Sequence, residues 1–212
     1  MVEVPRLFLY SLKLTDPHHQ SLSELVGKTA PTIRIGMIEN AADVIPDSAG
    51  WVRGIRDSLE EKGYKIEPID LREWTGKTEA LRALLFSKDV IWVGGGHTYY
   101  LRWILKSSGA DLIIRDFVRA GQVYAGWSAG AVVAGPTTLY YDSMGDDPAA
   151  APEYLSDGLG LTEISVVPHI NNPEFRAGAL ETATFLEKAG YKPLPLEDEQ
   201  VLIIRGENQS SV

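Results

Sequence analysis

The pattern Gly126-Trp127-Ser128-Ala129-Gly130 places a hydroxyl group between glycines at the spacing Gly-x-Ser-x-Gly. The apolar residues 123–125 before it favour a strand, and the small residues 131–134 after it favour a helix. A serine on a sharp strand-to-helix turn exposes its hydroxyl, and small neighbours let strand and helix approach closely. We therefore interpret Ser128 as a candidate nucleophile. The alternative interpretation is an ordinary turn of small residues.

A serine nucleophile needs a general base, and His169 is the best candidate. It is the histidine that follows an expected strand, residues 164–167, downstream of Ser128. An imidazole can take the serine proton near neutral pH, and an acid at its other nitrogen fixes the tautomer. The adjacent His18 and His19 lie in a polar, loop-like segment, where a solvated pair is favoured over a metal site.

The acid that would orient the base has two contenders. Asp142 lies in the polar, acidic segment 137–152 after the serine turn, which is expected to form a loop. Asp198 lies between two late strands, with Glu197 and Glu199 as neighbours. Sequence spacing leaves this choice open.

Three glycines, Gly94-Gly95-Gly96, follow the apolar residues 89–93. They match neither of the glycine patterns that bind nucleotides, so a nucleotide site is a weak interpretation. In a parallel sheet this turn can point backbone N–H groups at the neighbouring strand end, where Ser128 would lie. The turn would then complete an oxyanion hole. The alternative is a tight turn without a ligand.

Strand and helix patterns alternate along the chain. Strands are expected at residues 7–10, 32–38, 64–71, 89–93, 123–125 and 164–167, and helices at 51–62, 78–86, 99–107, 131–134 and 174–188. Residues 191–197 and 200–205 are expected to form a final hairpin. This alternation predicts the α/β fold class, with a mostly parallel sheet and helices on both faces. The length of 212 residues predicts a single domain, residues 1–212.

The composition argues against several partners. A net charge of −9 disfavours nucleic acid and anionic membranes, and no apolar run approaches the length that spans a bilayer. The chain has no cysteine, which removes disulfides, thiolate metal sites and a cysteine nucleophile. We expect a cytoplasmic protein that acts on a small molecule or a small peptide, with no cofactor and no metal. A homodimer is left open.

The glycine and serine motifs together resemble those of the dipeptidase E family of serine peptidases, which is related to cyanophycinase. The resemblance covers most of the chain in order and is carried by Gly94–Thr98, Gly126–Ala131, Gly135–Thr137 and Pro168-His169. It implies the fold of class I glutamine amidotransferases with a nucleophile elbow. It also implies hydrolysis of dipeptides that begin with aspartate.

By this resemblance Ser128 is the nucleophile, His169 the base, and Gly96 and Ala129 the oxyanion donors. The family usually has Asn after the three glycines, and this chain has His97 at that substrate-binding position.

The family's acids do not align simply with this chain. Asp142 falls one position earlier than the family's acid, and Asp198-Glu199 replaces an acid-Gly turn. Asp198 is slightly preferred because it precedes a strand expected to return to the sheet.

A bound aspartate side chain would need a cation, and Arg176 at the start of an expected helix is the candidate. The alternative is a solvated arginine. Two other functions stay open: an α/β-hydrolase esterase, which shares the elbow, and a non-catalytic amidotransferase-like binding domain.

Overall fold

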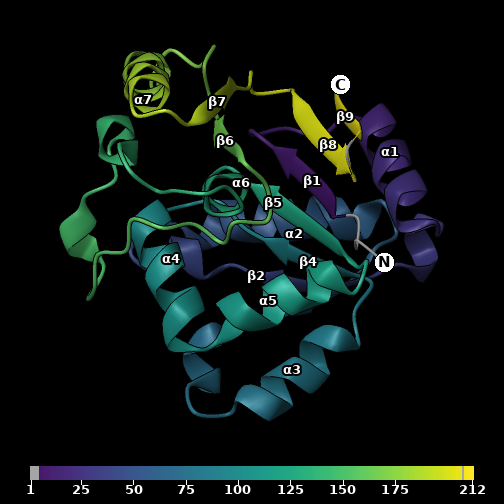
Figure 1. Ribbon diagram of the computed structural model, residues 1–212. Coiled ribbons are helices and arrows are strands. Elements are labelled where there is room, and N and C mark those ends of the chain that lie inside the picture. Colours follow the sequence, from purple (N-terminus) through teal and green to yellow (C-terminus); the bar gives the residue numbers. More distant parts are fainter. Residues whose placement is uncertain (1–4, 207) are drawn as a thin grey trace.

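Short apolar runs form a seven-stranded sheet with the order β3-β2-β4-β5-β1-β8-β9 in the computed structural model, which describes residues 5–206 and 208–212 (Figure 1). The strands are β1 (Arg6–Tyr10), β2 (Arg34–Ile38), β3 (Lys65–Pro68), β4 (Val90–Val93), β5 (Val123–Trp127), β8 (Val201–Arg205) and β9 (Asn208–Ser211). The first five pair in parallel, and β8 and β9 are antiparallel. The predicted α/β class with a mostly parallel sheet is confirmed.

Helices cover both faces of this sheet, as predicted. One face is covered by α3 (Thr78–Phe86), α4 (Thr98–Ser107), α5 (Ala110–Arg119) and α6 (Ala129–Val133), and the other by α1 (Asp16–Val26) and α2 (Ala49–Glu61). Side chains of β4 alternate accordingly: Ile91 and Val93 join the first core, and Val90 and Trp92 join the second. This alternation is what a strand covered on both faces requires.

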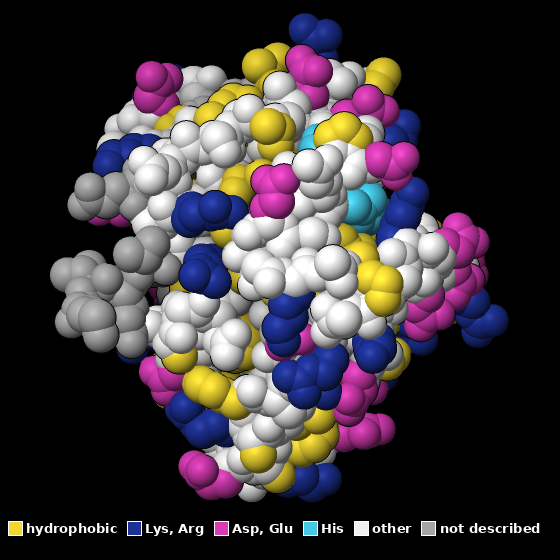
Figure 2. Space-filling view, turned by 90° about the vertical axis from the view of Figure 1, so that its right-hand side faces the viewer, with side chains coloured by type: hydrophobic (Ala, Val, Ile, Leu, Met, Phe, Trp, Pro, Cys, Tyr) yellow, Lys and Arg dark blue, Asp and Glu magenta, His cyan; other side chains and the backbone are white. Residues whose placement is uncertain are grey.

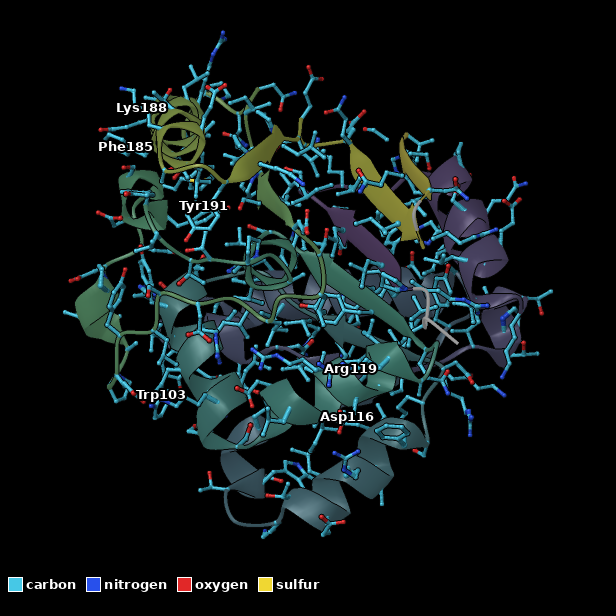
Figure 3. All side chains as sticks on the ribbon, viewed as in Figure 1. Trp103, Asp116, Arg119, Phe185, Lys188 and Tyr191 are labelled. Atoms are coloured by element: carbon cyan, nitrogen blue, oxygen red, sulfur yellow. The ribbon has the colours of Figure 1, made fainter. Side chains whose placement is uncertain are left out.

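The helices of the first face are also joined at their surface. Figure 3 shows Asp116 and Arg119 on α5, and Asp116 forms an ion pair with Arg82 of α3. Short 3-10 helices complete the fold: η1 (Ala30–Thr32), η2 (Asn40–Ala42), η3 (Leu71–Trp74), η4 (Tyr141–Met144) and η5 (Pro148–Ala150).

A second, two-stranded sheet lies beside the large one. It pairs β6 (Ile164–Val167) with β7 (Lys192–Pro195) in parallel, and α7 (Arg176–Lys188) connects them (Figure 1). The expected hairpin of residues 191–205 is therefore wrong, because β7 pairs with β6 while β8 pairs with β1. Pro193 and Pro195 cannot donate backbone hydrogen bonds, which suits β7 to the edge of a small sheet.

The helix α7 packs on the loop that follows α6. The rings of Phe185 and Tyr140 have centroids 5.2 Å apart, and Figure 3 shows Phe185 and Lys188 on α7 with Tyr191 beyond its end. The two-stranded sheet, α7 and η4 share a small apolar core that includes Tyr141, Val167 and Leu186. This core holds the segments after β6 and β7 in place.

Three local expectations are corrected. The segment containing His18 and His19 was expected to be a loop and is the helix α1, whose start is fixed by the Thr15 N–H donating to His18 Nδ1 at 3.1 Å. His18 is only 5% exposed, so the pair is not simply solvated. The helix α5 and the strand β9 were not predicted.

The charge distribution on the surface and the length of the helices can be compared with what nucleic-acid or membrane partners would require. On the face that Figure 2 shows, basic and acidic side chains are interspersed. No helix in residues 5–206 or 208–212 combines the length and apolar character needed to cross a membrane.

Candidate active site

Ser128 lies on a strained turn between β5 and α6. Its φ and ψ are 47° and −111°, a conformation that residues with a side chain rarely adopt. The two flanking glycines make this turn sterically feasible. A Cβ on Gly126 would lie 2.5 Å from the Gly130 carbonyl oxygen, and a Cβ on Gly130 would clash with the Val93 carbonyl. The close approach expected from the Gly-x-Ser-x-Gly pattern is present.

The structure places His169 beside Ser128, with 2.9 Å between Nε2 of the histidine and Oγ of the serine. His169 follows β6, which belongs to the small sheet and not to the large one. Its own φ is 65°, so both partners have a positive φ, which residues with a side chain seldom adopt. The His169 N–H donates to Oγ of Ser11 at 2.8 Å, which fixes this unusual conformation from the end of β1.

Asp198 completes a line of hydrogen bonds. Its Oδ1 lies 2.8 Å from Nδ1 of His169, and its Oδ2 accepts from Asn172 Nδ2 at 2.9 Å. The Asp198 N–H donates to Asn171 Oδ1 at 2.8 Å. With both carboxylate oxygens held, Asp198 is oriented toward the imidazole edge that faces away from Ser128.

The other acid is placed elsewhere. Asp142 is exposed, and its Oδ1 accepts from the Tyr99 hydroxyl at 3.2 Å. Burial raises the pKa of Tyr99, so that hydroxyl stays protonated and able to donate. Among the described residues, His169 bonds neither Asp142 nor Glu197 or Glu199.

The glycine turn lies against the serine. β4 and β5 are neighbours, and a Cβ on Gly95 would lie 3.0 Å from the Ser128 Cβ. Gly96 has φ 136°, and a Cβ there would clash with the Ala41 carbonyl, so glycine is required. Within the described part of the chain, neither the Gly96 nor the Ala129 N–H donates a hydrogen bond. Both residues line the same cavity as Ser128, which leaves two backbone donors for a ligand oxygen.

That cavity has a volume of about 390 Å³ and is mainly apolar. Its lining consists of Leu12, Ile45, Trp51, Ile55, Gly96, Thr98, Trp127, Ser128, Ala129, Val132, Tyr141, Met144, Asp146, Pro168, His169 and Phe175. The ring of Phe175 packs on His169 with a centroid separation of 5.1 Å, and Trp51 meets the edge of Trp127 at 5.4 Å. A peptide side chain can be accommodated beside the serine.

Two residues expected at the substrate do not line this cavity. His97 is buried and caps α4, where its Nδ1 accepts from the Tyr100 N–H at 3.3 Å. Arg176 is exposed at the first position of α7, and its neighbour Phe175 enters the cavity instead. The sequence placed both residues near the site, but backbone direction turns their side chains elsewhere.

Sequence reasoning missed several residues of the site. Ser11, Asn171 and Asn172 hold the histidine and the acid, and Asp146 lines the cavity. A usable signal existed for Ser11, which directly follows a strand, and for the asparagine pair, which lies two residues after His169. Among residues 5–206 and 208–212, no group of three or more His, Cys, Asp or Glu side chains could hold a metal ion.

Comparisons with known proteins show the family of this chain. The family model for peptidase family S51 matches residues 16–212. An uncharacterized peptidase of Listeria monocytogenes serovar 1/2a is 31% identical over 87% of this chain and 85% of its own length. A peptidase E of Shewanella amazonensis is 31% identical over 65% of this chain and 57% of its own length.

Solved structures share the fold. A Listeria monocytogenes EGD-e protein assigned provisionally to peptidase E has a TM-score of 0.82 at 26% identity, covering 99% of this chain and 98% of that one. A peptidase from an acI-B1 actinobacterium has a TM-score of 0.70 at 16% identity, covering 99% and 87%, and shows the fold alone. This chain therefore belongs to peptidase family S51, a family of peptide-bond hydrolases.

Proposed function

We propose that the chain is a serine peptidase that hydrolyses short peptides through an acyl-enzyme formed on Ser128. The observation that supports this most directly is the line of hydrogen bonds from Asp198 through His169 to Ser128, at the wall of a partly open cavity. A hydroxyl, an imidazole and a carboxylate in this order are the components of nucleophilic acyl transfer.

In the first step Oγ of Ser128 attacks the scissile carbonyl carbon, and its proton moves to Nε2 of His169. The Nδ1–H of His169 stays hydrogen-bonded to Asp198, which stabilises the imidazolium. The carbonyl oxygen gains negative charge and accepts from the N–H groups of Gly96 and Ala129. The C–N bond then breaks, and Nε2 returns the proton to the departing amine.

In the second step water attacks the acyl carbonyl carbon, and Nε2 of His169 takes a proton from the water. The bond between that carbon and Oγ of Ser128 then breaks, Nε2 returns the proton to Oγ, and the carboxylic acid product leaves. Each step uses groups that lie within hydrogen-bonding distance in the structure, so the site needs no large rearrangement between them.

The aspartyl preference implied by the family resemblance has less support than the serine chemistry. A carboxylate in a partly dry cavity must be paired, and no lining residue among those described is Lys or Arg. We therefore propose hydrolysis of short peptides, without a preference for an N-terminal aspartate. The single domain, the cytoplasmic location, the homodimer and the absence of a nucleic-acid partner stay predictions.

Labelling with a fluorophosphonate probe tests the proposed chemistry. We expect the probe to modify Ser128, as located by peptide mapping, and Ser128→Ala to abolish the label. An unlabelled, folded protein would instead favour the non-catalytic binding domain. A panel of dipeptides and short-chain esters separates the remaining alternative, since an esterase would hydrolyse the esters and leave the dipeptides intact.

A further inference from the structure

The cavity beside Ser128 has walls that suit an uncharged side chain. Trp51, Ile55 and Trp127 form one part of its lining, and Val132, Met144 and Phe175 contribute elsewhere. Burial of an apolar side chain against such walls is favourable at about 25 cal/mol per Å² of area removed from water. An aspartate side chain would lose its hydration there without gaining a cation.

One carboxylate interrupts this apolar lining. Asp146 follows η4, is half-buried, and accepts the Thr98 N–H through Oδ2 at 2.8 Å. Its Oδ1 accepts no hydrogen bond from the described residues. The carboxylate of Asp198 is not available in the same way, because His169 and Asn172 occupy its two oxygens. Asp146 is thus the anionic group that the cavity offers to a ligand.

A peptide bound for attack by Ser128 would contact both the apolar lining and the Asp146 carboxylate. If the scissile carbonyl lies between Ser128 and the N–H groups of Gly96 and Ala129, the preceding Cα lies one bond away. The side chain and the amino group both branch from that Cα, so both must lie in or at the cavity. A free α-ammonium there needs an acceptor with negative charge.

We propose that this cavity binds the N-terminal residue of a peptide with an uncharged, apolar side chain, and that Asp146 binds its α-ammonium group. This inference rests on the proposed serine peptidase activity and names its substrate class. It makes the chain selective for a free N-terminus, because an acetylated amine carries no charge for Asp146 to pair with. It also places aspartate among the poor residues at this position.

The experiment compares dipeptides that all release alanine: Leu-Ala, Phe-Ala, Asp-Ala and N-acetyl-Leu-Ala. We expect kcat/KM for Leu-Ala and Phe-Ala to exceed that for Asp-Ala by tenfold or more, and acetylation of Leu-Ala to cost a similar factor. These wild-type measurements need no folded variant. A higher kcat/KM for Asp-Ala than for Leu-Ala would overturn the proposal.

Asp146→Asn then tests the anchor itself. The amide oxygen can still accept the Thr98 N–H, so the start of α4 keeps its partner. We expect kcat/KM for Leu-Ala to fall by tenfold or more, mainly through KM, and that for N-acetyl-Leu-Ala to stay unchanged. Equal losses on both substrates would indicate a purely structural role and overturn the assignment.

Asp147→Asn is the matched control, because Asp147 is the exposed neighbour and does not line the cavity. It removes the same charge and should leave both substrates unaffected. Fluorophosphonate labelling of Ser128 is measured in parallel. Loss of labelling together with loss of dipeptide hydrolysis would reject the peptidase itself, whereas labelled enzyme that prefers Asp-Ala would reject only this inference.

Discussion

Asp198 and His169 meet at 2.8 Å because they leave the same ends of two neighbouring parallel strands, β7 and β6. The Leu196 N–H donates to the Val167 carbonyl at 2.8 Å, and the Ile170 N–H donates to the Leu196 carbonyl at 3.1 Å. These backbone bonds extend the pairing almost to the two side chains. The acid and the proposed base are therefore held as a unit.

Replacement of Asp198 should reduce turnover far more than replacement of Asp142. Asp198→Asn removes the charge that stabilises the imidazolium, so we expect kcat/KM to fall by roughly a thousandfold or more. Asp142→Asn removes a charge that His169 does not contact, and its amide oxygen can still accept from the Tyr99 hydroxyl, so kcat/KM should change by less than about threefold. Dipeptide hydrolysis by the two purified variants measures both values. Comparable losses would mean that Asp198 does not orient the base.

The losses of kcat caused by substituting the nucleophile and the base should not be additive. Ser128→Ala and His169→Ala are each expected to lower kcat by several orders of magnitude, and the double variant should be no slower than the worse single variant. The reason is that either change removes the whole proton-transfer unit. Single-turnover assays on all three variants give the comparison. Multiplicative losses would show that the two side chains act independently.

Gly130 should tolerate no side chain. Gly130→Ala puts a methyl group against the Val93 carbonyl, and we expect the free energy of unfolding to fall by about 1–3 kcal/mol, with loss of activity. Gly54→Ala is the control, because Gly54 lies inside α2 with open space around its Cβ position. That change should stabilise the protein by about 0.5–1 kcal/mol. Urea unfolding of both variants provides the values, and similar effects would contradict the steric argument.

Arg176 should have no influence on selectivity. Its side chain is exposed and does not line the cavity, so Arg176→Ala is expected to leave the ratio of kcat/KM for Asp-Ala over Leu-Ala within about twofold of wild type. A tenfold fall in that ratio, about 1.4 kcal/mol, would return Arg176 to the substrate site.

Low pH should weaken the ion pairs that Asp89 forms with Lys28 and Arg34. Burial would raise the pKa of Asp89, but hydrogen bonds from Arg34 and Lys28 outweigh it and lower that pKa to about 2. A carboxyl with a depressed pKa in the folded state stabilises the fold above its unfolded pKa of about 3.9, and loses this effect as the pH falls toward 2. Both cations are about half-exposed, so the contribution is about 1 kcal/mol.

Asp89→Asn tests this contribution. The variant should be less stable than wild type by about 1 kcal/mol at pH 7, and the difference should shrink between pH 4 and pH 2.5. Urea titrations at pH 7, 5, 4, 3 and 2.5 follow the difference. A constant difference across this range would show that the Asp89 charge does not stabilise the fold.

Local patterns predicted much of the fold and the position of the serine. The Gly-x-Ser-x-Gly spacing and the end of β6 were sufficient to single out Ser128 and His169, because each depends on residues close in sequence. The helix α5 was missed although its apolar residues Ile113, Ile114 and Phe117 have helical spacing. The strand β9 is exposed throughout and has no apolar alternation to reveal it.

Long-range pairing could not be predicted from the same patterns. The choice between Asp142 and Asp198 depends on β7 pairing with β6, whereas the turn residues between β7 and β8 suggested a hairpin. The lining of the cavity could not be predicted for the same reason, since Leu12, Trp51 and Phe175 come from distant parts of the chain. Residues that meet only in the folded protein leave no spacing to detect.

The position of Ser11, at the end of the first strand, has a consequence for the timing of synthesis. Ser11 holds the backbone of His169, and the next two N–H groups, of Leu12 and Lys13, donate to the Asp198 carbonyl at 3.0 and 2.7 Å. Residues 11–13 can therefore make these contacts only after His169 and Asp198 have been synthesised. A nascent chain that already contains Ser128 would lack its base and acid, and β1 would lack its partner β8. If Ser128 is the nucleophile, hydrolytic activity would appear only after residue 198 has been synthesised, because Asp198 and His169 are both needed for proton transfer.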